Sequence, residues 1–376
     1  IRDPLWSRGL GDVYKRQYEV WNDIYSASAE CEVAIYGSSR AWVHINPEIL
    51  SDSLGYKTYN FGMDGQNFLL QYMRHLEFLK HNKKPNIIII YADDLGYGDV
   101  SAYGMGILKT PNIDKIAKDG ILFKKGYSSS ATCSPSRYGL LTGRYPWRNK
   151  NAKILTGANL IIDTTEITLP SMLKREGYNT GIVGKWHLGL GNSIINYNVK
   201  INPGPNEVGF DYSFIMPDTQ DRVPTVYIEN GNVVNLDKKD PIAVSFEKNF
   251  EGEPTGKENP ELLSMMWHHG HNGSIVNGIP RIGFMKGGDN AKWSDIDMAD
   301  EFLEKAKKYI NSVYESPFFL FYTLQQPHVP RTPHPRFKGK SEMGPRGDAI
   351  LEADWSFANL YDFLEEKYLL ENTVII

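Results

Sequence analysis

The sequence predicts an α/β fold in which helices cover both faces of a largely parallel sheet. Three apolar stretches predict strands, at Asn86–Ala92, Thr180–Val183 and Phe318–Tyr322. Runs of β-branched and aromatic residues without polar alternation are typical of strands buried on both faces. Helical patterns separate these stretches, and the alternation of strand and helix indicates parallel strands joined by helical crossovers.

The predicted helices have recognisable beginnings and ends. Thr110 and Pro111 supply an N-cap and a first-turn proline, and Gly120 closes the same helix. Pro317 stops an amphipathic pattern further along the chain. By contrast, residues 191–290 are rich in Gly, Asn and Pro without clear periodicity, and we expect long surface loops there. The predicted helices are 111–119, 170–176, 302–313 and 349–364, and a last strand is predicted at 373–376.

The chain divides into three pieces of different character. Residues 1–17 show no periodicity and resemble translated sequencing-adapter read-through, so we expect them to be non-native. Residues 18–82 contain two short apolar strands, each followed by a tight loop. Residues 83–376 have the alternating pattern of one α/β unit. These differences predict a chimeric junction close to Asn82 and Pro85.

The second piece, residues 18–82, resembles the opening of an SGNH-like hydrolase. The resemblance rests on Val33–Arg40 and Tyr59–Gly65, and it puts Ser39 at the nucleophile position and Gly62 beside an oxyanion hole. A serine nucleophile needs a base, and no later stretch resembles the aspartate–histidine block of that family. We therefore expect this piece to be an inactive fragment.

Composition argues against two classes of partner. The formal net charge of −4 does not suit a general nucleic-acid-binding surface. No apolar run approaches the length of a membrane span. The two cysteines lie far apart in the chain and do not make a disulfide framework. We therefore expect neither nucleic acid nor membrane as a partner.

The stretch Cys133–Arg144 contains the most reactive combination of side chains. Pro135 predicts a loop that turns into a helix, because proline suits the first helical turn. Cys133 would then lie at the helix N-terminus, where free amides and the helix dipole lower a thiol pKa and attract anions. Arg137 adds a cation within the first turn. A cysteine-phosphatase loop would instead need an arginine at position 139, which is glycine.

Polar side chains also follow the three predicted strands, where α/β sheets bind ligands. Asp93 and Asp94 come directly after the first strand, and adjacent carboxylates favour a hard cation such as Ca²⁺ or Mg²⁺. Lys185 and His187 follow the second and would face one side of an extended segment, which suits an anionic ester. His328 follows the third between two stiffening prolines. The ordinary alternatives are a solvated acidic turn for Asp93 and Asp94, an exposed edge for Lys185 and His187, and a capping histidine for His328.

Four segments resemble motifs of the type I sulfatases of the alkaline phosphatase superfamily, and they occur in the same order as in that family. They are Asp93–Gly96, Cys133–Arg137, Gly184–His187 and Gln326–His328. The resemblance implies an alkaline-phosphatase-like α/β sandwich with a largely parallel central sheet. It also implies a sulfuric ester hydrolase that acts on a sulfated carbohydrate or an aryl sulfate. A sulfated galactose or N-acetylgalactosamine is the expected substrate.

The resemblance further implies how the catalytic group is made. A formylglycine-generating enzyme or an anaerobic sulfatase-maturating enzyme would oxidise Cys133 to Cα-formylglycine, an aldehyde whose hydrate is the nucleophile. Asp93, Asp94 and residue 133 would bind Ca²⁺ rather than Mg²⁺. The resemblance also implies that the native chain is periplasmic or secreted, although no signal peptide is visible.

Other side chains complete the implied mechanism. Arg137 would stabilise the ionised nucleophile, while Lys185 and His328 offset charge on the sulfuryl oxygens. His328 would protonate the leaving alcohol, and His187 would deprotonate the second hydroxyl of the hydrate. Three neighbouring residues are candidates for substrate contact: Arg331, His334 and Arg336. Three histidines in a Gly-rich stretch are interpreted as surface or substrate-loop residues and not as a metal site: His268, His269 and His271.

The sequence departs from the family pattern at its end. Sulfatases complete the metal site with an Asp-Asn pair and a lysine beyond a strand that residues 373–376 resemble, and a smaller C-terminal subdomain follows. Because neither appears here, we expect weak calcium binding, poor folding and little or no activity from these residues. The alternatives are a metal-dependent phosphatase or phosphodiesterase of the same superfamily, against which the cysteine speaks, and an inactive truncated binding protein.

Overall fold

The computed structural model describes most of the chain in two compact units, Ile1–Lys84 and Pro85–Ile376. Ser39 and the predicted non-native segment 1–17 lie outside the described residues. No helix in the part that the structure describes is both long and apolar enough to cross a membrane. The described residues are 19–31, 33–36, 45–62, 68–81, 84–104, 107–153, 156–267 and 270–376.

The first unit contains the two strands that were predicted for it. β1 (Val33–Ile35) and β2 (Thr58–Asn60) pair in parallel, and helices α3 (Pro47–Leu54) and α4 (Phe68–His81) follow them in turn. The amide of Gly62 donates to Oδ1 of Asn60 (2.9 Å), so it is already engaged within the unit. The small core of this unit includes Val20, Ile24, Ala29, Phe61 and Phe78.

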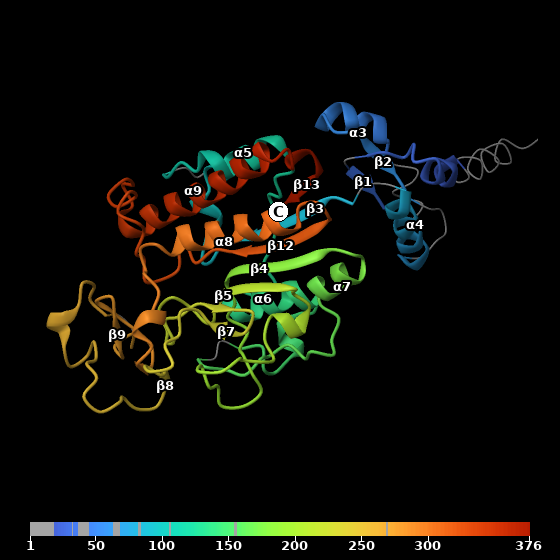
Figure 1. Ribbon diagram of the computed structural model, residues 1–376. Helices are drawn as coiled ribbons and strands as arrows, with labels where there is room; N and C mark the ends of the chain where they lie inside the picture. The colour runs from blue at the N-terminus through green and yellow to red at the C-terminus, as the bar shows by residue number, and fades with distance from the viewer. Residues whose placement is uncertain are drawn as a thin grey trace, which may run out of the picture. The chain divides into compact units, whose positions relative to one another are not determined.

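The second unit is built on a seven-stranded sheet in the order β13-β3-β12-β4-β5-β6-β7 (Figure 1). The first five of these strands are parallel, and the last two are antiparallel to their neighbours. This arrangement confirms the predicted α/β class. The bounds are β13 Thr373–Ile375, β3 Asn86–Tyr91, β12 Phe318–Thr323, β4 Asn179–Lys185, β5 Tyr212–Met216, β6 Ile228–Glu229 and β7 Asn232–Val233.

Helices cover both faces of this sheet. In Figure 1, α5 (Pro111–Asp119), α8 (Met298–Val313) and α9 (Gly344–Glu366) lie on one side, and α6 (Cys133–Thr142) and α7 (Leu169–Arg175) lie on the other. Short 3-10 helices lie in the connections, at Tyr97–Asp99, Ser101–Tyr103, Pro146–Arg148, Asn206–Val208, Pro260–Leu262, Asp289–Ala291 and Leu370–Asn372.

Strand β12 shows why the sheet needs two cores. Phe319 and Phe321 pack with residues of α6 and α7, whereas Phe318, Leu320 and Tyr322 pack with residues of α8 and α9. Successive side chains of a strand point to opposite faces, so a continuous apolar run supplies both cores at once. All six residues of β12 are buried.

The N-terminus of α5 is capped differently from the prediction. Thr110 makes no side-chain cap hydrogen bond. Instead the amides of Asn112 and Ile113 donate to Oδ1 of Asp354, at 3.1 and 2.8 Å. A carboxylate at this end satisfies free amides and favours the helix dipole. Asp354 belongs to α9, so the cap also fastens the two helices together.

The expectation of long surface loops over residues 191–290 was wrong in part. β5, β6 and β7 belong to the main sheet, and residues 213–228 are buried almost throughout. Very short strands show no periodicity, which is why the Gly- and Asn-rich composition dominated the prediction. Two antiparallel pairs lie further on: β8 (Ala243–Ser245) with β11 (Phe284–Lys286), and β9 (Ile275–Val276) with β10 (Ile279–Pro280).

Candidate active site

The site lies where three neighbouring strands end. Thr323 of β12 is in register with Tyr91 of β3 and with Gly184 of β4. The segments that follow these strands therefore begin at the same edge of the sheet. The amide of Asp93 donates to the carbonyl oxygen of Gln326 (2.9 Å), which ties two of them together.

Helix α6 presents Cys133 to this edge as its first residue. Thr132 precedes it with extended backbone (φ −130°, ψ 157°) and makes no side-chain cap. The amide of Ser136 donates to the Thr132 carbonyl (3.1 Å), which closes the first turn around Pro135. The predicted loop-to-helix transition is thus present, and the side chain of Cys133 is partly exposed.

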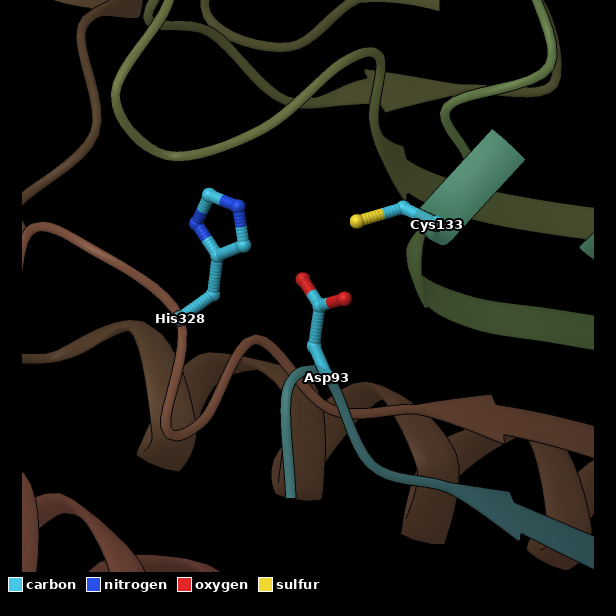
Figure 2. Close-up of side chains that lie close together, drawn as sticks. All are labelled: Asp93, Cys133 and His328. Atoms are coloured by element: carbon cyan, nitrogen blue, oxygen red, sulfur yellow. The ribbon is translucent and has the colours of Figure 1, made fainter. Parts of the chain in front are cut away.

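Asp93, Cys133 and His328 converge on one point. Their potential ligand atoms all lie within 4.8 Å of one another. Figure 2 shows the three side chains pointing toward one another from three separate elements. Asp93 follows β3, Cys133 begins α6 and His328 follows β12. Segments far apart in the sequence are therefore brought together by the order of the strands.

Two buried cations surround Asp93. The ammonium of Lys185 forms an ion pair with Oδ2, and Nη2 of Arg137 lies 3.7 Å from Oδ1. Nη1 of Arg137 also donates to the carbonyl of Lys185 (2.8 Å). Burial raises the pKa of Asp93, but the charges of Lys185, Arg137 and His328 outweigh it and hold the pKa at about 2. The carboxylate is ionised at neutral pH as a result.

The expectation of a lowered thiol pKa at Cys133 was wrong. Burial raises the pKa of the thiol above its ordinary value. Lys185 and Arg137 lower it, but Asp93 and Asp94 act in the opposite direction. Burial disfavours the charged thiolate. Its effect on the pKa exceeds the opposite effect of the helix dipole and the two cations, because acidic side chains lie in the same site.

Asp94 and His328 form the more open part of the site. Asp94 has a left-handed backbone (φ 63°) and a side chain that is 53% exposed. Its Oδ2 lies 3.8 Å from Nε2 of His328. Nδ1 of His328 lies 2.6 Å from the carbonyl oxygen of Val329. Since a carbonyl only accepts, Nδ1 carries a proton and Nε2 is directed to the Asp94 side.

His187 is buried beside the same cluster but not by the predicted geometry. It has a left-handed backbone (φ 53°), so the alternation expected of an extended segment does not apply to Lys185 and His187. Nη1 of Arg222 lies 2.8 Å from its Nε2. Burial lowers the pKa of His187 well below its ordinary value, and the cations Lys185 and Arg222 add to this.

The remaining candidates are engaged in other contacts. Arg336 pairs with Asp300 (2.7 Å), and Nε2 of His334 lies 4.0 Å from Asp297. Nε of Arg331 donates to the carbonyl of Pro327 (3.1 Å). His268 and His269 lie outside the described residues. Nε2 of His271 lies 3.3 Å from Asp221, and His271 belongs to no group of three possible metal ligands among the residues described.

Sequence reasoning missed the polar segment after β5. Asp218 is buried and its pKa is raised to about 6, mainly by burial. Arg222 contacts His187 from the same segment. No motif marks these residues, but they follow the carboxyl end of a strand of the sheet. Recognising β5 would have directed attention to them by the rule that identified Asp93, Lys185 and His328.

Comparisons with known proteins indicate the family of the chain. A family model described as sulfatase matches residues 85–376. The chain is 52% identical over 299 residues to N-acetylgalactosamine-6-O-sulfatase of Bacteroides thetaiotaomicron, covering 79% of this chain and 58% of that protein. It is 29% identical over 305 residues to human N-acetylgalactosamine-6-sulfatase, covering 77% and 48%. The chain thus spans about half the length of the curated relatives it matches.

Solved structures give the same result. One, described in terms of glycosaminoglycan metabolism by Bacteroides thetaiotaomicron, superposes with a TM-score of 0.77 at 52% identity, covering 78% of this chain and 62% of that chain. A sulfatase from Pseudoalteromonas sp. superposes with a TM-score of 0.55 at 26% identity, covering 81% and 56%. The second unit thus combines a largely parallel α/β sheet with a cysteine at the start of a helix. The chain belongs to the sulfatase family.

Proposed function

We propose that the protein hydrolyses sulfate esters of a sulfated glycan, with residue 133 as the nucleophile after conversion of Cys133 to formylglycine. The convergence of Asp93, Cys133 and His328 beside two buried cations is the observation that carries this proposal. A 6-O-sulfated N-acetylgalactosamine unit is the proposed substrate, because a relative with 52% identity is named for that activity. A periplasmic or secreted location would suit such a polymer.

The state of the cysteine supports conversion to an aldehyde. A thiol with a raised pKa is mostly protonated at neutral pH and is a poor nucleophile. An unmodified thiol or hydroxyl would also remain blocked as a stable sulfated product. The hydrate of an aldehyde has two hydroxyl groups, of which one attacks sulfur and the other later expels sulfate. We therefore propose a sulfatase-maturating enzyme as a partner.

Asp93, Cys133 and His328 form the group of possible metal ligands among the described residues, and Asp94 is the neighbouring carboxylate that would add a hard oxygen donor. Asp93 and Asp94 offer carboxylate oxygens, which Ca²⁺ prefers, whereas a thiol is a soft ligand that suits Ca²⁺ poorly. A hydroxyl at position 133 would turn the set into three oxygen donors. A bound Ca²⁺ would act as a Lewis acid that polarises a sulfuryl oxygen and favours the ionised nucleophile. We propose Asp93, Asp94 and residue 133 as its ligands.

The protein's own cations would stabilise the reacting group. Lys185 and Arg137 are fully buried. Asp93 holds the ammonium of Lys185, and the carbonyl oxygen of Lys185 accepts a hydrogen bond from Arg137. Cations fixed in a dry site stabilise developing negative charge without reorganising. We propose that Lys185 faces the sulfuryl oxygens and that Arg137 faces the nucleophile. Arg137 has the capacity for more bonds, since its Nε and Nη2 have no hydrogen-bond partner among the described residues.

His328 is the proposed proton donor to the leaving alcohol. Its Nδ1–H is occupied by the Val329 carbonyl, so the second ring nitrogen is the one that exchanges protons. Oδ2 of Asp94 lies 3.8 Å from that nitrogen. As the bond between sulfur and the ester oxygen breaks, the proton would pass from Nε2 to that oxygen. The product is then a neutral alcohol.

The experiment is co-expression with a sulfatase-maturating enzyme, followed by mass spectrometry of the peptide that contains Cys133. We expect the mass of an aldehyde, and an unmodified thiol would contradict the proposal. Turnover is measured with 6-O-sulfated N-acetylgalactosamine, with an aryl sulfate and with an aryl phosphate. Two proteins are compared, the 376-residue chain and the same chain fused to the portion of its Bacteroides relative that it does not cover. A fused protein that carries the aldehyde but cleaves only phosphate esters would favour the phosphatase alternative.

A further inference from the structure

We propose that a cationic cleft at the opposite end of α6 from Cys133 binds an anionic saccharide chain, as a second site separate from the catalytic one. The cleft has a volume of about 510 Å³, and volumes of about 300–1,000 Å³ are usual for ligand sites. Six residues line it: Tyr138, Arg144, Arg148, Asn149, Lys150 and Glu166.

The length of α6 separates this cleft from the catalytic site. Cys133 is the first residue of the helix and Thr142 is the last. Gly143 ends the helix with a left-handed backbone (φ 66°), and Arg144 follows it directly. Ten residues of α-helix rise about 15 Å. The cleft therefore lies about one helix length from the catalytic cysteine.

The lining of the cleft carries an excess of positive charge. It contains three cations and one carboxylate, which gives a net charge of +2. Nη1 of Arg144 pairs with Oε1 of Glu166 (2.5 Å). Arg148 and Lys150 are both exposed, and neither forms an ion pair with a residue that the structure describes. Two unpaired cations beside one cleft favour an anion there, although the chain has a formal net charge of −4.

Two exposed aromatic side chains lie between the arginines of the cleft in the sequence. Tyr145 and Trp147 are 59% and 72% exposed. Their rings stack, with centroids 5.8 Å apart and an interplanar angle of 17°. The guanidinium of Arg148 lies 5.1 Å from the centre of the Trp147 ring. An exposed stacked pair offers a broad apolar surface next to charge, and the face of a sugar ring that carries only C–H bonds packs against such a surface.

Backbone contacts hold the segment that carries these groups. Residues 146–148 form a 3-10 helix, and the amide of Arg148 donates to the carbonyl of Tyr145 (3.0 Å). The side-chain amide of Asn149 donates to the carbonyl of Ile161 (3.1 Å), which fastens the segment to a neighbouring loop. A ligand that binds to such a fixed turn loses less free energy in ordering it.

The combination of charge and aromatic surface indicates the class of ligand. Arg148 and Lys150 suit sulfate or carboxylate groups, and the aromatic pair suits the sugar rings that carry them. An amphipathic peptide helix would need an apolar groove, whereas every lining residue here is charged or polar. Single-stranded nucleic acid also binds cations beside aromatic rings, but the net charge of −4 opposes a long, dense polyanion. If the proposed function holds, the cleft would keep the substrate polymer close to the catalytic site.

The test is a calorimetric titration of the 376-residue chain with four probes of matched length. They are a dextran sulfate oligosaccharide, neutral dextran, oligoglutamate and oligothymidylate. We expect dextran sulfate to bind most tightly, with an affinity that falls as salt is added. Tighter binding of oligoglutamate or oligothymidylate would overturn the assignment to a saccharide. Equal binding of neutral dextran would contradict the role of the cations.

Variants at exposed positions locate the binding without disturbing the core. The double variant Arg148→Gln/Lys150→Gln should weaken the binding of dextran sulfate about fivefold, and Trp147→Ala should weaken it about threefold. The matched control is Lys109→Gln/Lys118→Gln, which removes two exposed cations from the α5 side of the sheet (Figure 1). We expect the control to keep the affinity of the parent. Equal losses in the two double variants would show general attraction of a polyanion and refute the site.

Two further titrations separate the cleft from other binding surfaces. His328→Asn should keep the affinity for dextran sulfate, whereas a loss would place the oligosaccharide in the catalytic site. The protein fused to the remaining portion of the Bacteroides relative should bind like the chain alone. Loss of binding there would assign the cleft to a contact with that portion and overturn the proposal. Because binding is measured without turnover, its result is independent of whether the sulfatase proposal succeeds or fails.

Discussion

Lys185 and Asp93 form an ion pair in which both side chains are buried, with 0% and 4% of their surfaces exposed. Lys185 is the last residue of β4 and Asp93 follows β3, so each of these two strands brings one charge to the site. A buried pair of this kind contributes little net stability, because desolvation offsets the attraction. Its value lies in fixing a cation and a carboxylate at defined positions.

Removing the lysine alone should therefore be costly. Lys185→Met leaves the Asp93 carboxylate with less compensation in a buried site, and we expect a loss of about 3–5 kcal/mol in the free energy of unfolding. The control is Lys174→Met, which breaks the half-exposed pair with Asp211 and should cost less than about 1 kcal/mol. Urea denaturation followed by fluorescence measures both. Equal losses in the two variants would contradict the assignment of Lys185 to a buried pair.

Glu352 should make stability fall as the pH rises. Burial raises its pKa from 4.5 to about 7, although bonds from His334 and Gln326 lower it. A raised pKa in the folded state gives stability that is complete below pH 4.5 and is lost as the pH rises through 7. The shift corresponds to about 3 kcal/mol. Glu352→Gln should be more stable than the parent at pH 8 and nearly equal to it at pH 4.5, whereas the exposed Glu366→Gln should follow the parent at both. Parallel pH profiles for Glu352→Gln and the parent protein would argue against this.

Gly184 should tolerate no side chain. Its φ is 117°, and a Cβ there would overlap the carbonyl oxygen of Thr323 in the neighbouring strand. Gly184→Ala should therefore separate the ends of β4 and β12, with a loss above about 4 kcal/mol. Gly177→Ala has a similar backbone (φ 85°) but nothing within 4 Å, and it should lose only about 1–2 kcal/mol. Thermal unfolding of both variants measures the difference, and a mild effect at position 184 would show that the strands can separate without cost.

Calcium should stabilise the matured protein through Asp94. A ligand that binds only the folded state raises stability in proportion to the logarithm of its concentration over Kd. We expect added Ca²⁺ to raise the melting temperature after Cys133 is converted, and Asp94→Asn to abolish most of that rise. Asp119→Asn, at an exposed helix end, is the control. A rise that persists in Asp94→Asn would place the ion elsewhere.

The framework of the second unit could be predicted because its long strands and helices are strongly patterned. The run at β12 and the stripe at α8 are both present where they were expected. The motifs after β3, β4 and β12 also indicated which side chains would be neighbours. The parallel order of those strands is what brings Asp93 and His328 together.

The errors arose where tertiary contacts override local rules. The pKa of Cys133 depends on burial and on two acidic neighbours from another segment, which no local pattern of α6 contains. The segment after β5 was missed because a five-residue strand has too few positions to show a period. His187 was misplaced because its left-handed backbone breaks the alternation that the argument assumed.

Strand β12 lies between β3 and β4, and the alternation of its side chains supplies both cores. A slip of one residue would exchange those two faces, so the whole interior resists any such displacement. The strands in the middle of the sheet thus set the relative positions of the reactive groups, although these groups lie on the segments that follow the strands. Mutations deep in the interior, remote from Asp93, Cys133 and His328, should consequently disturb the relative positions of these three side chains.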